Sequence, residues 1–200
     1  MAKIDSSNLE LEERVAKTNK CQKTHKGGRT MSCNALVVVG DGHGHVGAAM
    51  GKARGIPDAI RKATEAAKKA LVRVPLDGTT IPHEVVMSWG ASRVMLKPAA
   101  PGTGVVAGGS VRTILEAAGV RDVLAKTLGS SNAINTAWAT LKALESLRTP
   151  EQVAALRGVE LSQLSIRRQS EAVATPTTPE TEGAVRVLGS YVDGSYTGGG

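Results

Sequence analysis

Residues 14–54 constrain the fold of this chain most, because three segments of contrasting character follow one another there. Residues 14–29 are basic, residues 35–39 read Ala-Leu-Val-Val-Val, and residues 40–54 are rich in glycine. The run of β-branched side chains predicts a buried strand, and the Gly-Asp-Gly sequence after it has the chemistry of a tight hairpin turn. We therefore expect a small antiparallel sheet, whose partner strand comes from residues 46–52.

The basic segment is read as an extended strand that runs into a loop. It carries cations at intervals of three residues, namely Arg14, Lys17, Lys20, Lys23, Lys26 and Arg29. No Asp or Glu occurs between Glu13 and Asp41, so these charges repel one another unless phosphates replace the counterions. Gly27 and Gly28 predict a turn between the last two cations, where bare backbone lets N–H groups approach phosphate oxygens. Nucleic-acid contact is favoured over a merely solvated face.

The charge distribution agrees with a polyanionic partner. Residues 1–76 hold 14 Lys and Arg against 7 Asp and Glu, which equals the whole net charge of +7. RNA, DNA and an anionic membrane are the candidates, and membrane is the weakest because no stretch is apolar enough to span a bilayer. The chain has no Phe, and its basic segment contains no aromatic residue. Binding is therefore expected through phosphates, sugar hydroxyls and shape, as for structured, double-helical RNA.

The start of the chain, MAKIDSSNLELEE, lacks the charged-then-apolar layout of a signal peptide and is too acidic for a transit peptide. Two cysteines, Cys21 and Cys33, do not make a disulfide framework in a chain of this size. We expect a reduced, cytoplasmic protein.

The expected organisation is α+β, with a flexible leader (1–13), a first domain (14–76), a second domain (77–165) and a disordered, Ser/Thr/Pro/Glu-rich tail (166–200). The first domain should be a small sheet backed by one helix that has Pro57 at its first position. Helical spacing predicts its buried stripe, composed of Ile60, Ala63, Ala67, Leu71 and Val74.

The second domain is expected to have two layers in the order β-β-α-β-α. Residues 81–89 and 93–97 read as a hairpin, with His83 in its first strand, and residues 98–109 read as a Gly/Pro-rich loop. Ser110 should cap a helix that Gly119 stops, and residues 120–126 should return as a strand. A long helix follows Asn132, and a capping-box pattern at Thr149 predicts a further short helix.

Other chemistry finds little support. Gly42–Gly47 matches the G-x-G-x-x-G dinucleotide fingerprint, but no helix can begin among the interrupting glycines, so a hairpin turn is favoured. Gly47–Lys52 resembles a P-loop but is one residue short and lacks the Ser or Thr that binds magnesium. The soft ligands do not match zinc spacing and are read as incidental; they are Cys21, His25, Cys33, His43 and His45. We find no catalytic constellation, and predict no enzyme activity, no cofactor and no metal.

Several blocks of the sequence together resemble one family. They are Lys26–Arg29 (KGGR), Ala35–Gly47 (ALVVVGDGHGHVG), Gly51–Ala63 (GKARGIPDAIRKA), Gly78–His83, Lys97–Arg112 (KPAAPGTGVVAGGSVR) and Leu128–Asn135 (LGSSNAIN). In unbroken order they look like bacterial small-subunit ribosomal protein five, over about residues 11–165. The resemblance implies a first domain similar to a double-stranded-RNA-binding domain and a second domain of the family's own α+β type.

The resemblance also implies site residues. Lys23, Lys26, Gly27, Gly28 and Arg29 match the family's loop that reaches into small-subunit rRNA, and Lys20 joins the RNA-binding candidates as a cation of the same basic segment. Lys52 and Arg54 match the family's Gly-Lys-Ala-Arg, and second-domain positions near rRNA are Arg112, Ser130, Ser131 and Asn132. Taken alone, the loops 98–110 and 129–132 are equally well explained as helix caps or as phosphate sites.

The chain departs from the family at a few positions. Met31 and Cys33 stand where the family usually has aromatic residues, and both are compatible with burial under the loop. His43 and Ala133 replace a typical Asn and Pro.

The implied function is that of a structural, rRNA-binding component of the small ribosomal subunit. The implied partners are small-subunit rRNA and small-subunit proteins four and eight, and the implied position influences translational accuracy, near the decoding region and the channel through which messenger RNA enters. The alternative is a free-standing double-stranded-RNA-binding regulator, and a nucleotide-dependent enzyme is weaker still.

Overall fold

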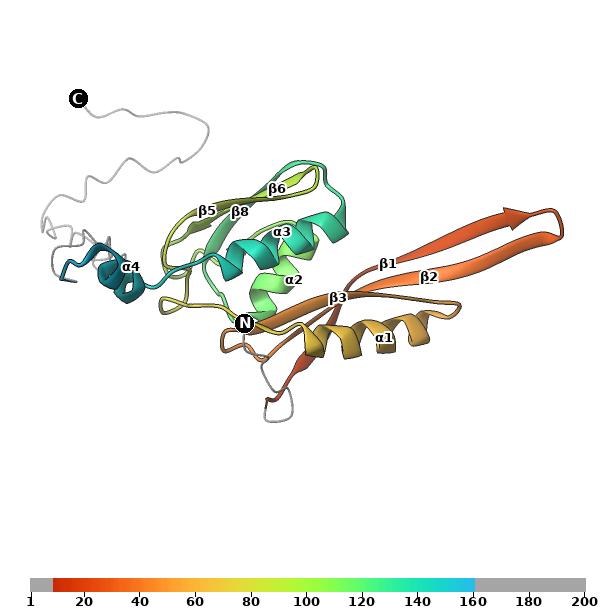
Figure 1. Ribbon diagram of the computed structural model, residues 1–200, viewed down its shortest axis with the longest axis horizontal. Helices are drawn as coiled ribbons and strands as arrows, with labels where there is room; N and C mark the ends of the chain where they lie inside the picture. Colours follow the sequence, from red (N-terminus) through yellow and green to blue (C-terminus); the bar gives the residue numbers. More distant parts are fainter. Residues whose placement is uncertain (1–8, 161–200) are drawn as a thin grey trace, which may run out of the picture. The chain divides into compact units, whose positions relative to one another are not determined.

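The computed structural model describes residues 9–160. These residues form the expected α+β architecture, with two four-stranded sheets and four helices (Figure 1). The predicted tail (166–200) and most of the predicted leader lie outside the described residues.

The first sheet is antiparallel throughout and has the strand order β1-β2-β3-β4. Its strands are β1 (Glu12–His25), β2 (Gly28–Gly40), β3 (His45–Ala53) and β4 (Val72–Arg73). One helix, α1 (Ile56–Lys69), packs on it. The predicted hairpin turns after positions 26 and 40 are therefore confirmed.

The apolar run 35–39 is continuous because β2 is covered on both faces. Ala35, Val37 and Val39 point to α1, where they meet Ala59 and other small side chains of the helix. Alternating residues of a strand point to opposite faces, so Leu36 and Val38 face the other way, into a second and larger core. Each fully buried Val or Leu contributes roughly 1.5–3 kcal/mol to folding.

The second sheet has the order β5-β6-β8-β7, in which β7 is parallel to β8 and the other pairs are antiparallel. Its strands are β5 (Val85–Trp89), β6 (Ser92–Pro98), β7 (Val105–Val106) and β8 (Val123–Gly129). The helices of this region are α2 (Gly109–Ala117), α3 (Ala133–Glu145) and α4 (Pro150–Arg157). The β-β-α-β-α order is thus correct apart from β7, which lies inside the predicted Gly/Pro-rich loop.

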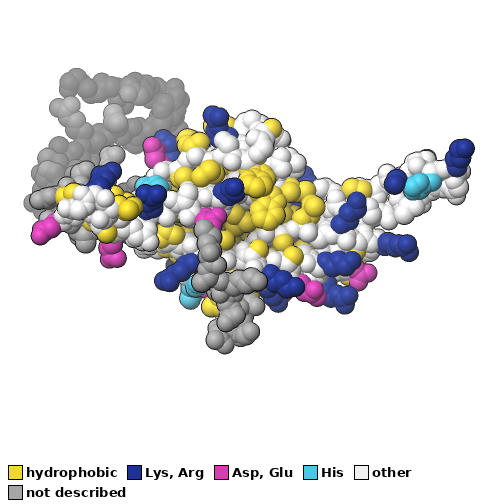
Figure 2. Space-filling model, in the orientation of Figure 1, with side chains coloured by type: hydrophobic (Ala, Val, Ile, Leu, Met, Phe, Trp, Pro, Cys, Tyr) yellow, Lys and Arg dark blue, Asp and Glu magenta, His cyan; other side chains and the backbone are white. Residues whose placement is uncertain are grey.

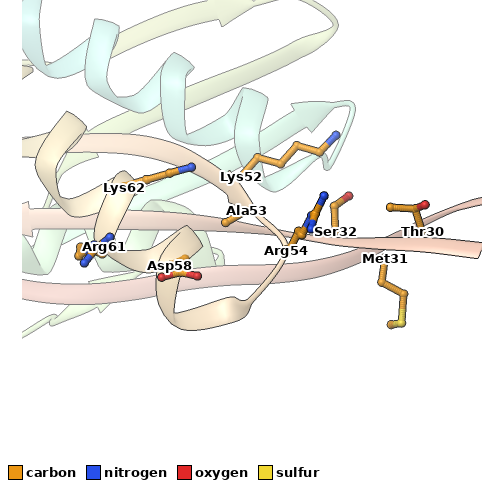
Figure 3. A pocket seen from close by; sticks show the side chains of 9 residues that line it. All are labelled: Thr30, Met31, Ser32, Lys52, Ala53, Arg54, Asp58, Arg61 and Lys62. Atoms are coloured by element: carbon orange, nitrogen blue, oxygen red, sulfur yellow. The ribbon is translucent and has the colours of Figure 1, made fainter.

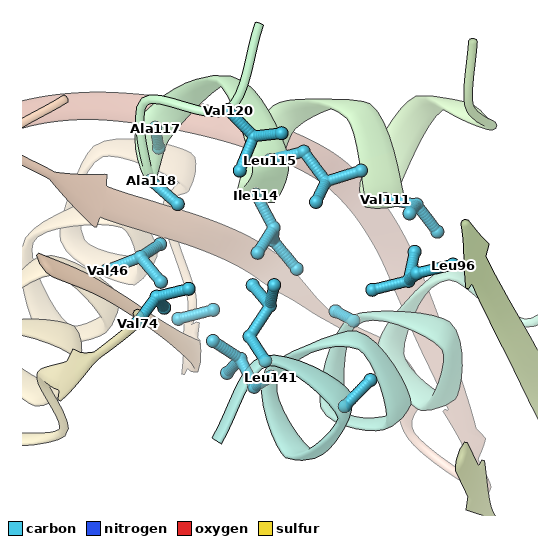
Figure 4. Close-up of a cluster of buried hydrophobic side chains, with 14 of the residues drawn as sticks. Val46, Val74, Leu96, Val111, Ile114, Leu115, Ala117, Ala118, Val120 and Leu141 are labelled. Carbon is cyan, nitrogen blue, oxygen red and sulfur yellow. The ribbon is translucent and has the colours of Figure 1, made fainter. Parts of the chain in front are cut away.

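The larger core draws on both sides of position 77. Val46 and Val74 of the first region lie with Leu96, Ile114 and Leu141 of the second (Figure 4). Backbone hydrogen bonds join the same regions, since Gly42 N–H donates to the Ala117 carbonyl (3.1 Å) and Gly44 N–H to that of Ala118 (3.0 Å). The β2–β3 turn is therefore held against the end of α2.

Several local predictions about α1 were wrong. The helix begins at Ile56, so Pro57 is its second residue, and it ends at Lys69, before Leu71. Ala59 is fully buried whereas Ile60 is only partly buried, because small side chains let α1 lie close to β3. A Cβ built on Gly51 would collide with the Ala59 carbonyl oxygen.

Three predictions in the second region also need correction. Gly108, not Ser110, precedes α2, and the Ser110 hydroxyl instead lies 2.8 Å from the Thr136 hydroxyl. The strand predicted from Val120 begins at Val123, and His83 precedes β5 rather than lying in it. In contrast, the Thr149–Gln152 capping box is present as predicted.

Candidate RNA interface

The part of the β1–β2 hairpin that extends past β3 is the most exposed regular structure among the described residues. β3 pairs with β2 only from Cys33 to Gly40, so the hairpin is two-stranded beyond that point (Figure 1). We call Lys17–Met31 the arm: residues 21–31 lie past β3, and Lys17–Lys20 pair with the part of β2 that still adjoins β3. Every residue of the arm is exposed. Its tip is a turn at Lys26 and Gly27, followed by Gly28 with a φ of 139°, where a side chain would be strained.

The arm presents cations on both of its faces. Alternation places residues three apart on opposite faces of a strand, and the register puts Lys17 and Lys23 on the face shared with Leu36. Lys20 and Arg29 lie on the other face, which is shared with Ala35. Figure 2 shows Lys and Arg side chains and a His at the end of the arm. A polyanion can therefore contact the arm from either side.

The arm's cations differ from Arg14 at its base. Arg14 forms ion pairs with Glu12 (3.0 Å) and with Glu116 of α2 (2.9 Å). Its hydrogen bonds to Glu12, opposed by partial burial, raise the pKa of its guanidinium above the ordinary value. Within residues 9–160, no ion pair involves the other cations of the basic segment, which are Lys17, Lys20, Lys23, Lys26 and Arg29. Arg14 therefore stabilises the packed base, and the arm's charges are free to meet phosphates.

The two positions where the family usually has aromatic residues have different environments. Cys33 is 6% exposed, so this position is buried. Met31 is compatible with burial but is 51% exposed. β3 pairs with β2 only from Cys33 onward, so Met31, two residues before it, has no neighbour in β3.

Lys52 and Arg54, at the end of β3 and just after it, are exposed beside the base of the arm. They line a shallow hollow of about 570 Å³ together with residues 30–32 of β2 and three residues of α1 (Figure 3). The α1 residues are Asp58, Arg61 and Lys62. Arg61 and Lys62 are not part of the buried stripe expected from helical spacing, and the sequence does not mark them as site residues, since their approach to the end of β3 depends on how α1 packs.

The second-region candidates are engaged in local structure. Arg112 on α2 is exposed, and its guanidinium donates to the Val105 carbonyl of β7 (2.9 Å). The Asn132 side chain caps α3 by accepting from the Ile134 N–H (3.3 Å). The Ser130 carbonyl accepts from the Ser92 hydroxyl (2.7 Å), and Ser131 is exposed. No side-chain hydrogen bond or ion pair connects these residues to the arm within the described part of the chain.

The Gly42–Gly47 motif is a hairpin turn, as favoured from the sequence. The carboxylate of Asp41 accepts from the N–H groups of His43 (2.7 Å) and His45 (3.0 Å) and lies 2.6 Å from His45 Nδ1. Burial alone would raise the pKa of Asp41, but these hydrogen bonds together lower it below its ordinary value. This carboxylate therefore stabilises the turn.

Among residues 9–160, no group of three or more His, Cys, Asp or Glu side chains has an arrangement that could hold a metal ion. None of the helices in that range is long and apolar enough to cross a membrane.

Comparison with known proteins places these features in one family. The family model described as ribosomal protein S5, N-terminal domain, matches residues 11–75, and that described as ribosomal protein S5, C-terminal domain, matches residues 87–157. A curated relative from Chloroflexus aurantiacus, small ribosomal subunit protein uS5, is 52% identical over 173 residues, which cover 85% of this chain and 97% of the relative.

Proposed function

This chain belongs to the ribosomal protein S5 family, and we propose that its arm is the element by which it binds folded rRNA. Membership of the family makes the chain a structural, rRNA-binding component of the small subunit of the cytoplasmic ribosome. The family is not one of enzymes, and we propose that the chain has no catalysis of its own.

One observation carries the role of the arm: its cations are exposed, form no ion pair with any other described residue, and are present on both faces. Lys20, Lys23, Lys26 and Arg29 supply charge to phosphates, and Gly27 and Gly28 allow the backbone to approach them closely. The arm has no Phe, Tyr or Trp side chain on which an unpaired base would stack. A folded, largely double-helical rRNA surface is therefore the ligand that the arm suits best.

Further contacts are proposed on the second region. Arg112 and the loop Ser130–Asn132 remain candidates for rRNA contact, in addition to their local roles. We also propose that the chain's protein neighbours are small-subunit proteins four and eight. In that position, near the decoding region and the channel through which messenger RNA enters, the chain would influence translational accuracy.

The test replaces Lys23, Lys26 and Arg29 with Ala in the full chain. Three fewer phosphate contacts should lower the slope of log affinity against log salt by about 2–3, and incorporation into small subunits should fall. The matched control replaces three exposed cations outside the arm with Ala, namely Lys69, Lys126 and Arg157.

Unchanged incorporation and an unchanged salt slope would contradict the proposal. Sedimentation at high salt distinguishes the alternative: a chain that remains in a soluble pool, rather than with small subunits, would be a free-standing regulator.

A further inference from the structure

The hollow at the base of the arm brings together three elements that are distant in sequence. Its residues come from the arm's end of β2, from the end of β3 and the residue after it, and from the first two turns of α1 (Figure 3). Figure 3 shows Arg54 beside Ser32. The fold, and not a single motif, assembles this surface.

The hollow is strongly cationic. Four of its nine side chains are Lys or Arg and one is an acid, Asp58. We call Lys52, Arg54, Arg61 and Lys62 the cradle; all four are exposed, and no ion pair within residues 9–160 involves them. Asp58 lies in the first turn of α1, where the helix dipole favours an acid, and it offsets only one of the four positive charges.

The same helix shows what balanced charge looks like. Lys68, two turns further along α1, forms an ion pair with Glu13 of β1 at 2.9 Å. Arg61 and Lys62 have no such partner between positions 9 and 160, although unpaired like charges in one hollow repel one another. A bound polyanion would relieve that repulsion.

The cradle is continuous with the arm. Two residues on the rim of the hollow, Thr30 and Ser32, lie opposite Lys23 and Cys21 of β1. Residues advance by about 3.3 Å along a strand, so the arm's cations begin within a few ångströms of the hollow. An RNA gripped by the arm would pass over the cradle where the arm joins the sheet.

We propose that the cradle is a second binding site for the sugar-phosphate backbone of RNA, in which Arg61 and Lys62 hold phosphodiester groups of the segment next to that held by the arm. This proposal rests on the proposed function of the arm. It extends the interface from the hairpin onto α1 and predicts that the chain holds RNA along a path and not at the tip alone.

The experiment measures the affinity of the full chain for small-subunit rRNA between about 50 and 200 mM salt. The cradle variant is Arg61→Ala/Lys62→Ala, and its matched control is Lys69→Ala/Lys126→Ala, which removes two exposed cations elsewhere. A charge-preserving variant, Arg61→Lys/Lys62→Arg, tests whether charge suffices. All the altered side chains are exposed, so the unfolding temperatures should agree with that of the unaltered chain.

The cradle variant should lose about 1.4–1.8 from the salt slope, and the control less than half of that. The charge-preserving variant should keep the slope. Inorganic phosphate at constant ionic strength should not compete, since the ligand is a chain of phosphodiesters; competition would overturn the proposal in favour of a free-anion site.

If the slope of log affinity against log salt were the same for the cradle variant and its control, the cradle would not be an RNA-binding site. The arm variant, in which Lys23, Lys26 and Arg29 are replaced by Ala, would still test the proposed function in the same series. If the unaltered chain showed no salt-dependent binding to small-subunit rRNA, both the proposed function of the arm and the proposed role of the cradle would be wrong.

Discussion

The two ends of the β1–β2 hairpin share one hydrogen-bonded ladder but differ in what surrounds it. At the base, β2 is covered on one face by α1 and on the other by the larger core. In the arm, both faces meet solvent. The same contrast holds for charge, because Arg14 is ion-paired at the base whereas Lys17, three residues later, has no ion pair among the described residues.

This difference separates stability from binding along a single element. Removing a side chain at the base leaves a cavity or an unpaired polar group, which costs folding free energy. Removing one in the arm leaves solvent in its place, so its effect should be on the ligand. The effect of a substitution at the base on stability can therefore be compared with that of a similar substitution in the arm.

The largest effect is expected for Leu36→Ala in β2, because this side chain is 3% exposed within the larger core. Truncation should lower the free energy of unfolding by about 2–5 kcal/mol. Met31→Ala, on the same strand but 51% exposed, should change it by less than about 0.5 kcal/mol. Denaturant titration of both variants measures the difference, and equal losses would mean that the arm is packed.

A smaller effect is expected for Gly51→Ala at the base. The added methyl group would meet the Ala59 carbonyl and the Ala63 backbone, so α1 must move away from β3. Overpacking of this kind costs about 1–3 kcal/mol. Gly27→Ala at the arm's tip meets nothing within 4 Å and should be close to neutral. Thermal unfolding compares the two; a neutral Gly51→Ala would show that close approach of α1 is not required.

Asp41→Asn tests the turn at the base, where the carboxylate is held by two N–H groups and His45. Because the pKa of Asp41 is lowered in the folded chain, its contribution is present above the unfolded pKa of about 4 and is lost as the pH falls through the lower, folded value. The variant should be about 1–2 kcal/mol less stable at neutral pH, and the difference should shrink below about pH 4.

Unfolding measured from neutral to acidic pH checks this. The control is Glu65→Gln, an exposed carboxylate in the middle of α1, which should matter less than about 0.5 kcal/mol at neutral pH. If the stability difference between Asp41→Asn and the unaltered chain grew on acidification, the ionised Asp41 carboxylate would not be the form that stabilises the turn.

The base was more predictable from sequence than the arm or the cradle. The run 35–39 has strand propensity and turn glycines that agree with its tertiary environment, so its burial followed from the pattern. The polar segment before it has no apolar periodicity that would predict a strand. The full length of β1 depends on its pairing with β2. Ser110 and Pro57 were each misplaced by a residue or two, as is common at helix ends.

The cradle was not predictable for a different reason. The sequence shows that Arg61 and Lys62 are outside the buried stripe, but a helix has several exposed faces. Which of them meets the end of β3 depends on how closely α1 packs at Gly51 and Ala59, which is a tertiary property. The strand β7 was not predicted either, because its two residues, Val105 and Val106, are too few to show the alternation of a strand.

The smallest effect on stability is expected for the arm's two faces. Lys17→Ala/Lys23→Ala removes two charges from one face, and Lys20→Ala/Arg29→Ala removes two from the other. None of these side chains forms an ion pair within residues 9–160, so each double variant should stay within about 0.5 kcal/mol of the unaltered chain, or gain slightly as repulsion falls. Their effects on rRNA binding carry the information, because an arm enclosed by folded RNA should lose about 1.4–1.8 from the salt slope in either case. An arm that lies flat on an RNA surface would lose that amount from one face only, and the face that matters would then identify the side on which the RNA lies.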